Sequence, residues 1–184
     1  MMNMEKNKRI AVIYKSAYGT TKRYAEWIAD ELDAELMEYK TVSSSLLGEY
    51  DIIVYGGGLY ASGILGADLV AKRHCENIVL FTVGLANPAK TDYTEIMEKS
   101  GLTEGAGVFH LRGGIDYKKL NLVHKGMMAM MKKMSIDKKS YEELNSEERA
   151  FVDTYGGKVD FTDKGAIAPL IEYVRSLQNK EQHR

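Results

Sequence analysis

The chain has little of what disulfide-bonded, thiolate-metal or membrane-spanning proteins require. Cys75 is its single cysteine in 184 residues, which excludes an internal disulfide and argues against a thiolate metal site. No apolar run approaches the ~20 residues needed to span a bilayer, and residues 1–9 show no apolar central region. We therefore expect a soluble protein without a transmembrane segment, with the cytoplasm as its default location.

An excess of charge of one sign is also lacking. The formal net charge is −1 and the sequence pI is about 6.4, so no basic field would attract nucleic acid, and there is no strongly acidic field. The four histidines, His74, His110, His124 and His183, show no metal-ligand spacing with one another or with Cys75. We expect no nucleic-acid partner and no metal. The length fits a single domain, residues 1–184, with one core.

Apolar runs suggest a sheet that is covered on both faces. They lie at residues 10–14, 50–55, 78–83 and 108–111, with a weaker candidate at 34–39. Most are continuous rather than alternating, which is typical of parallel strands, and the helical stretches between them fit the crossovers such a sheet needs. The first helix has its apolar residues on one stripe: Tyr24, Ala25, Ile28, Ala29 and Leu32. The pattern predicts an α/β fold.

A long insertion separates the last predicted strand from the last helix, over about residues 113–160. Its first part, residues 120–134, has leucine, valine and many methionines at a 3–4 spacing, which predicts a helix with one strongly apolar face. The simplest interpretation is core or lid packing. The alternative is an exposed face that docks an apolar substrate, a membrane surface or a partner protein. In the closing helix, Pro169 must lie in the first turn or cause a kink.

A tight turn rich in hydroxyl groups follows the first predicted strand. Residues 16–21 read Ser-Ala-Tyr-Gly-Thr-Thr and lead straight into the first helix. The first N–H groups of a helix lack intrahelical partners and the helix dipole adds positive charge, so a phosphate binds there without a basic side chain. Gly19 permits a positive φ or a close backbone approach. The turn predicts a phosphate site; an ordinary turn with a threonine N-cap is the alternative.

The pattern Ser16-x-x-Gly19-x-Thr21 after the first strand resembles the FMN-phosphate loop of the flavodoxin family, usually Ser/Thr-x-Thr-Gly-x-Thr. Tyr18 replaces the middle threonine and removes one hydroxyl, although backbone amides supply most of the binding in that family. The resemblance spans nearly the whole chain. It implies a flavodoxin-like, doubly wound, five-stranded parallel sheet of order 2-1-3-4-5, with the helical insertion between the last strand and the last helix. It also implies non-covalently bound FMN.

Two further loops complete the expected cofactor site. The glycine-rich run 55–63 directly follows the third predicted strand, whose end borders the point where the winding of such a sheet reverses; flavodoxin with FMN is the standard example of this rule. The resemblance implies that this run borders the flavin ring and its N5, that Tyr60 stacks on the ring, and that residues 84–87 border the pyrimidine side. An ordinary glycine-rich surface loop is the alternative for 55–63. Tyr93 is the nearest aromatic residue for the second ring face.

The predicted cofactor-binding residues come from the ends of three strands. No catalytic residue can be named from the sequence. The set is Ser16, Ala17, Tyr18, Gly19, Thr20, Thr21, Gly57, Gly58, Leu59, Tyr60, Ala61, Gly84, Leu85, Ala86 and Asn87.

Other nucleotide-binding interpretations fit less well. The spacing Gly56-x-Gly58-x-x-Ala61 satisfies the dinucleotide fingerprint, but it follows the third strand, and no acidic residue closes a second strand at the required distance. A phosphoacceptor receiver domain needs acidic residues at the ends of strands one and three, where this chain has Ser16 and Gly56. No Walker lysine motif follows the first turn.

The insertion carries a second, narrower resemblance. Residues 109–117 lead into an apolar helix ending Met-Met-Lys-Lys-Met, which resembles the long insertion of flavodoxin-domain proteins similar to menaquinone-dependent protoporphyrinogen dehydrogenase. That resemblance implies an oxidoreductase acting on a large apolar substrate or quinone, and it leaves room for peripheral membrane contact. The alternative is a flavodoxin-type electron carrier with a redox partner protein, although such carriers are usually more acidic. A flavin-free structural or regulatory module is the third possibility.

Overall fold

The computed structural model describes residues 8–43, 45–60, 63–71, 77–101 and 106–179. Its central sheet has five parallel strands in the order β2-β1-β3-β5-β6, with the short strand β4 antiparallel to β3. This is the predicted order 2-1-3-4-5, so the α/β fold class is confirmed. The strand bounds are β1 Ile10–Lys15, β2 Glu35–Glu38, β3 Ile52–Tyr60, β4 Gly63–Ile64, β5 Ile78–Gly84 and β6 Gly107–Arg112.

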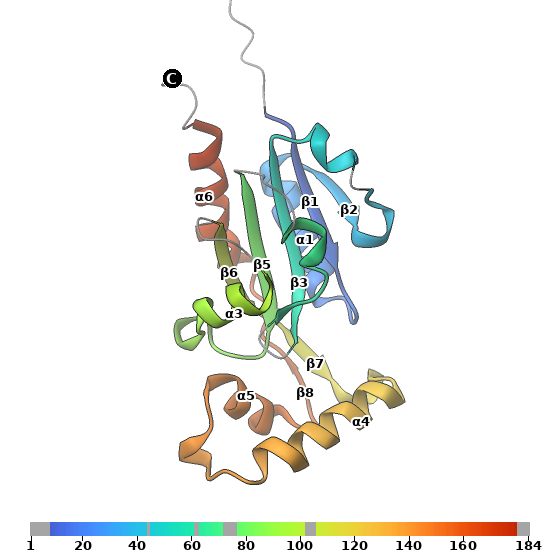
Figure 1. Cartoon of the computed structure of the whole chain (residues 1–184), viewed down its shortest axis with the longest axis vertical. Helices are drawn as coiled ribbons and strands as arrows, with labels where there is room; N and C mark the ends of the chain where they lie inside the picture. Colours follow the sequence, from blue (N-terminus) through green and yellow to red (C-terminus); the bar gives the residue numbers. More distant parts are fainter. Residues whose placement is uncertain (1–7, 44, 61–62, 72–76, 102–105, 180–184) are drawn as a thin grey trace, which may run out of the picture.

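Helices cover both faces of the sheet, which explains the continuous apolar runs. On one face lie α1, Thr20–Leu32, and α6, Ala168–Asn179. On the other lie α2, Asp68–Ala71, and α3, Tyr93–Lys99, with the 3₁₀ turns Tyr39–Thr41 and Leu46–Glu49 (Figure 1). Successive strand residues point to opposite faces, so alternate residues of β1 enter two separate cores.

The predicted apolar stripe of α1 is the face that it buries. Tyr24, Ala25, Ile28, Ala29 and Leu32 all lie against the sheet, together with Thr21. The helix ends at Asp33, whose left-handed backbone (φ 50°) lets its N–H donate to the Ala29 carbonyl. Pro169 lies in the first turn of α6, where its missing N–H costs no helical hydrogen bond.

The insertion leaves the sheet and returns to it through a two-stranded stem. Strand β7, Gly114–Asp116, pairs antiparallel with β8, Lys158–Asp160, so the segment between them begins and ends at one stem. Between them lie the 3₁₀ turn Tyr117–Lys119, α4 Leu122–Met131, a π-helical segment Lys132–Ile136, the 3₁₀ turn Tyr141–Glu143 and α5 Ser146–Thr154. A small core of Ile136, Leu144 and Phe151 joins the last three.

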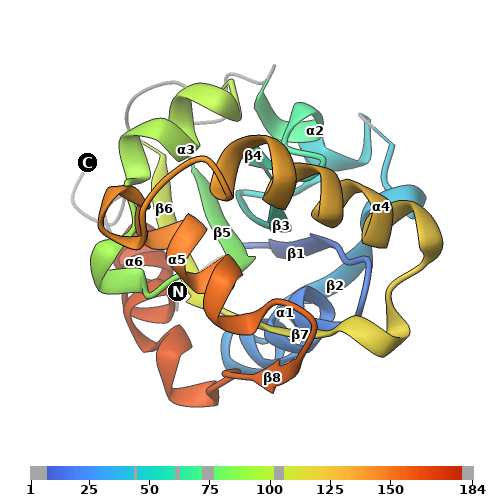
Figure 2. The ribbon, with the colours of Figure 1, turned by 90° about the horizontal axis from the view of Figure 1, so that it is seen from below.

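The insertion faces the edge of the sheet at which the parallel strands end. Figure 1 shows α4 and α5 below the carboxyl ends of β1, β3 and β5, and Figure 2, seen from below, shows both helices across those ends. Ligands of open α/β sheets bind at this edge. The insertion is therefore placed on the same side as any cofactor held by the strand-end loops.

Two expectations fail in this architecture. The glycine-rich run is not a loop after the third strand, because β3 continues through residues 56–60 and β4 pairs back onto its end. Core packing also fails for most of the methionine-rich stretch 120–134, since no residue of α4 is buried; Leu120 before the helix is buried, and Met128 packs partly against the small core of the insertion. In both cases the neighbours in the folded chain decided the outcome. They extend β3 through the glycine-rich run, and they leave α4 exposed.

Candidate cofactor site

The turn after β1 has the geometry of an open anion site. Gly19 precedes α1 with φ 94°, a left-handed conformation that favours glycine. The Ser16 hydroxyl oxygen accepts a hydrogen bond from the Gly19 N–H at 3.0 Å, which fixes the turn. No side chain caps α1, so the alternative of an ordinary turn with a threonine N-cap does not apply, and the first-turn amides are left for a ligand.

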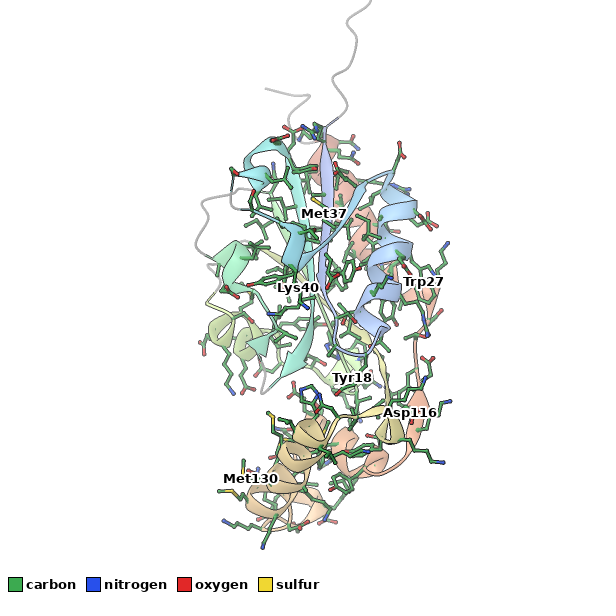
Figure 3. All side chains as sticks on the ribbon, turned by 90° about the vertical axis from the view of Figure 1, so that its right-hand side faces the viewer. Tyr18, Trp27, Met37, Lys40, Asp116 and Met130 are labelled. Carbon is green, nitrogen blue, oxygen red and sulfur yellow. The ribbon has the colours of Figure 1, made fainter. Side chains whose placement is uncertain are left out.

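The side chains of the turn point in different directions. Ala17, Tyr18 and Gly19 are exposed, whereas Thr21 is only 3% exposed. The Tyr18 hydroxyl forms a hydrogen bond with His124 Nδ1 and accepts one from the Asn121 N–H at 3.5 Å. Tyr18 thus reaches the start of α4 in the insertion (Figure 3), which accounts for a tyrosine where the family pattern has a threonine.

The turn lies where the winding of the sheet reverses. Strand β1 has β2 on one side and β3 on the other, and Lys15, the last residue of β1, is paired with Gly57 of β3. The carboxyl ends of β1 and β3 therefore meet beside the turn. In an open sheet of this order the ligand crevice forms at that position.

The glycines of β3 have structural roles of their own. A side chain on Gly56 would collide with the Phe81 ring, and one on Gly57 would collide with the Leu65 carbonyl oxygen. Both faces are thus filled by the protein, and close packing explains these two glycines without a flavin. Gly58 and Leu59 continue the same strand. The backbone of Tyr60 ends it, while the Tyr60 side chain and Ala61 lie outside the described residues.

The loop after β5 is held from behind by β6. The Arg112 Nε–H donates to the Leu85 carbonyl at 3.0 Å, and His110 Nε2 lies 3.2 Å from the Ala86 carbonyl oxygen. The Asn87 side chain is occupied, since its Oδ1 accepts from the Ala89 N–H. The predicted residues Gly84 to Asn87 therefore form a braced loop at the same edge of the sheet as the turn at residues 16–21.

His110 was assigned no function from the sequence. It is 3% exposed, and a side chain on Gly84 would meet its ring. Burial lowers the pKa of His110 to about 4, so the ring is neutral and its Nε2–H can donate to Ala86. The available signal was its position inside the apolar run 108–111, where a polar side chain needs a buried partner.

Tyr93 does not extend from the β5 loop as a free ring. It begins α3, is partly buried, and its hydroxyl donates to the Pro88 carbonyl at 3.5 Å. The Tyr93 side chain therefore lies against the loop that precedes α3.

Comparison with known proteins defines the class. The flavodoxin domain family matches residues 11–142, which is more than half of the chain, so the chain belongs to that family. An uncharacterized protein of Methanocaldococcus jannaschii is 38% identical over 94 residues, covering 48% of this chain and 63% of that protein. The chain thus matches less than two thirds of that relative's length.

Solved structures with related folds include several flavodoxins. A flavodoxin from the domain Archaea is 18% identical, with 57% of this chain and 85% of that chain covered and a TM-score of 0.40. The two-electron reduced flavodoxin of Megasphaera elsdenii is 16% identical, with 55% and 82% covered and a TM-score of 0.44. A flavoprotein of Lactobacillus acidophilus in complex with FMN is 20% identical, with 57% and 92% covered and a TM-score of 0.37.

The residues present fit the phosphate end of FMN, the cofactor predicted from the turn and supported by the family match. The exposed turn, the positive φ of Gly19 and the uncapped start of a 13-residue helix are the parts that such a phosphate needs. Within the described ranges, no group of three or more histidine, cysteine, aspartate and glutamate side chains could hold a metal. In the same ranges no helix has the length and apolarity to cross a membrane.

Proposed function

We propose that this chain is an FMN-binding oxidoreductase of the protoporphyrinogen dehydrogenase type, acting on a large apolar substrate or a quinone. One observation carries this proposal: an uncapped helix start behind an exposed turn, at the winding reversal of a flavodoxin sheet, faces a helical insertion. FMN, when bound, supplies the electron-transfer chemistry. The chain binds the phosphate through the turn Ser16 to Thr21 and borders the ring through the ends of β3 and β5.

The insertion distinguishes this proposal from a simple electron carrier. A carrier needs an accessible flavin edge, and additional layers over that edge would hinder docking of a redox protein. Here Tyr18 ties the phosphate turn to α4, and the Ser146 hydroxyl donates to the Lys90 carbonyl at 2.8 Å. These two contacts join the insertion to the loops after β1 and β5. The space beneath the insertion is thus suited to a substrate molecule rather than to a docked redox protein.

The exposed face of α4 fits an apolar phase or substrate. Exposed fractions are 86% for Leu122, 69% for Val123 and 59% for Met130. Residues 117–139 also contain seven lysines and one aspartate, in a chain of net charge −1. Apolar side chains beside lysines are typical of helices that lie on anionic bilayers. We infer that this surface meets the membrane in which a quinone dissolves.

The experiment measures cofactor binding first and turnover second. Purified protein is titrated with FMN, reduced, and mixed with menaquinone or protoporphyrinogen IX. We expect yellow protein and many turnovers per flavin. Bound FMN without turnover on either compound would support the electron-carrier alternative. Protein that stays colourless after incubation with FMN would support the flavin-free module and refute the proposal.

Membrane contact is tested separately by co-sedimentation with vesicles. We expect binding to vesicles of phosphatidylglycerol and phosphatidylcholine, weaker binding at high salt, and loss of binding in Met130→Glu. Equal recovery with pure phosphatidylcholine vesicles would contradict the charge argument, because that lipid carries no net charge.

A further inference from the structure

A cleft of 480 Å³ lies between the loop after β5 and the insertion. Its size falls within the usual range of small-molecule sites, about 300–1,000 Å³. Figure 2 shows α5 in front of the ends of β5 and β6 when the molecule is viewed from below. The residues that line it are Asn87, Lys90, Arg112, Tyr141, Leu144, Ser146, Arg149, Ala150 and Asp153.

Three cations border this cleft without a carboxylate partner. In the part of the chain that the structure describes, no ion pair involves Lys90, Arg112 or Arg149. Several cations elsewhere are paired, for example Arg23 with Asp160 at 2.9 Å and Lys139 with Glu148 at 2.6 Å. At this cleft, three cations without an ion pair among the described residues lie together.

Two of the three cations are held in fixed positions by other contacts. The Arg112 guanidinium stacks on the Phe161 ring at 3.7 Å and donates through Nε to Leu85. Arg149 donates through an Nη atom to the Glu142 carbonyl at 2.9 Å, and its buried Nε has no acceptor among the described residues. Each guanidinium therefore keeps donors that no protein acceptor uses, in orientations set before any ligand arrives.

The single carboxylate in the lining is already engaged. Both oxygens of Asp153 lie 3.2 Å from the Tyr141 hydroxyl, which can donate to either. One aspartate cannot neutralise three cations, so the cleft has a surplus of positive charge. Its field favours an anion over a neutral or cationic ligand.

We propose that this cleft binds an anionic group, a carboxylate or a phosphate, on the redox substrate of the enzyme. The inference rests on the proposed function, because Asn87 and Arg112 also belong to, or brace, the loop expected to border the flavin. A substrate anchored here by its anion would place its apolar body beneath the insertion. The guanidinium fork recognises carboxylate and phosphate alike, so the source of the anion is decided by experiment.

The test uses the full FMN-loaded chain and two kinds of anion. Mesoporphyrin IX, with two carboxylates, is compared with its dimethyl ester, and NADPH supplies the phosphate arm; binding is measured by calorimetry at fixed ionic strength. We expect one anion to bind, and Lys90→Gln and Arg149→Gln each to weaken it about tenfold, the order of one charge-assisted contact. If the cleft binds a carboxylate, the dimethyl ester should bind the parent protein no more tightly than mesoporphyrin IX binds Lys90→Gln or Arg149→Gln.

The controls separate charge in the cleft from charge in general. Lys40→Gln removes an exposed lysine directly after β2, at the opposite edge of the sheet from β5 and β6, with no hydrogen bond or ion pair among the described residues, and should leave affinity within twofold. Figure 3 labels this lysine. Lys90 is likewise exposed and its ammonium has no such partner, so Lys90→Gln is decisive if Arg149→Gln loosens the insertion. Unchanged affinity for both anions in Lys90→Gln, or no binding of either, would overturn the inference.

The outcome is distinguishable from failure of the proposed function. Protein that binds FMN and turns over quinone, yet shows no dependence on Lys90, refutes the anion cleft alone. Protein that binds the anion through Lys90 and never turns over refutes the oxidoreductase alone.

Discussion

Helices α1 and α4 have similar apolar spacing, but the apolar face of α1 is buried and that of α4 is exposed. In α1 the stripe from Tyr24 to Leu32 is buried against the sheet, whereas in α4 Leu122, Met127 and Met130 are all at least half exposed. Apolar residues at a 3–4 spacing predict a helix with an apolar face, but they do not say what covers that face. In α1 the sheet covers the apolar face. In α4 these three side chains stay exposed, while Met128 on the same helix packs partly against the core of the insertion.

The largest expected effect comes from truncating one apolar side chain in each helix and comparing the loss of stability. Ile28 is fully buried under α1, so Ile28→Ala should lower the free energy of unfolding by about 2–5 kcal/mol through lost transfer energy and a residual cavity. Met130→Ala, its match on α4, should change it by less than about 0.5 kcal/mol. Urea denaturation followed by circular dichroism measures both. A comparable loss in Met130→Ala would show that the α4 face is covered after all.

The contrast between α1 and α4 also explains which features of the fold could be predicted from the sequence. The sheet order, the two-sided burial and the insertion bounds followed from continuous apolar runs and from the family resemblance, because strand residues such as Ile13 and Val79 have no alternative to burial. The extent of β3 could not be predicted, since Gly56 and Gly57 read as a loop until Phe81 and Leu65 are seen to need the space.

Within the site, the sequence could predict local geometry but not long-range contacts. The Gly19 turn is encoded within six residues, and the structure has it as an open, uncapped helix start. The role of Tyr18 depends on His124, more than a hundred residues away, and that of His110 depends on the Ala86 carbonyl. No spacing rule connects such pairs, so these residues were missed or assigned other roles.

A second prediction concerns the phosphate turn. Thr21→Val should weaken FMN binding by about 1.5–3 kcal/mol, roughly 10–150-fold in Kd, through loss of a charge-assisted hydrogen bond. Thr21 is almost fully buried, so valine, which has nearly the same shape, keeps the packing at the start of α1 and removes only the hydroxyl. Flavin fluorescence quenching gives the Kd, and Thr94→Val, an exposed threonine on α3, is the control. An unchanged Kd in Thr21→Val would show that the turn is misassigned.

A third prediction follows from the buried histidine under the β5 loop. The pKa of His110 is about 4 in the folded chain against an ordinary 6.5, so between these values the unfolded chain binds more protons. Stability is therefore full above pH 6.5 and declines as the pH falls toward 4. From pH 7 to pH 5 we expect His110 to account for a loss of about 2 kcal/mol.

Denaturation of the parent chain and of His110→Gln at both pH values measures that contribution as a difference. The variant should be less stable at pH 7, and it should lose less stability than the parent on going to pH 5. Parallel losses in the two proteins would mean that His110 titrates normally and does not brace the Ala86 carbonyl.

The smallest expected effect tests whether α4 is tied to the rest of the chain only at its start. Tyr18→Phe removes the hydroxyl that joins the phosphate turn to His124 and Asn121. Because Tyr18 is 42% exposed, the global free energy of unfolding should fall by no more than about 0.5–1 kcal/mol. Hydrogen exchange should nevertheless accelerate at the amides that begin α4 while α1 stays protected, since local opening there no longer breaks a contact with the turn. Equal acceleration in both helices would mean that the two regions open together, and that α4 depends on the sheet through contacts other than Tyr18.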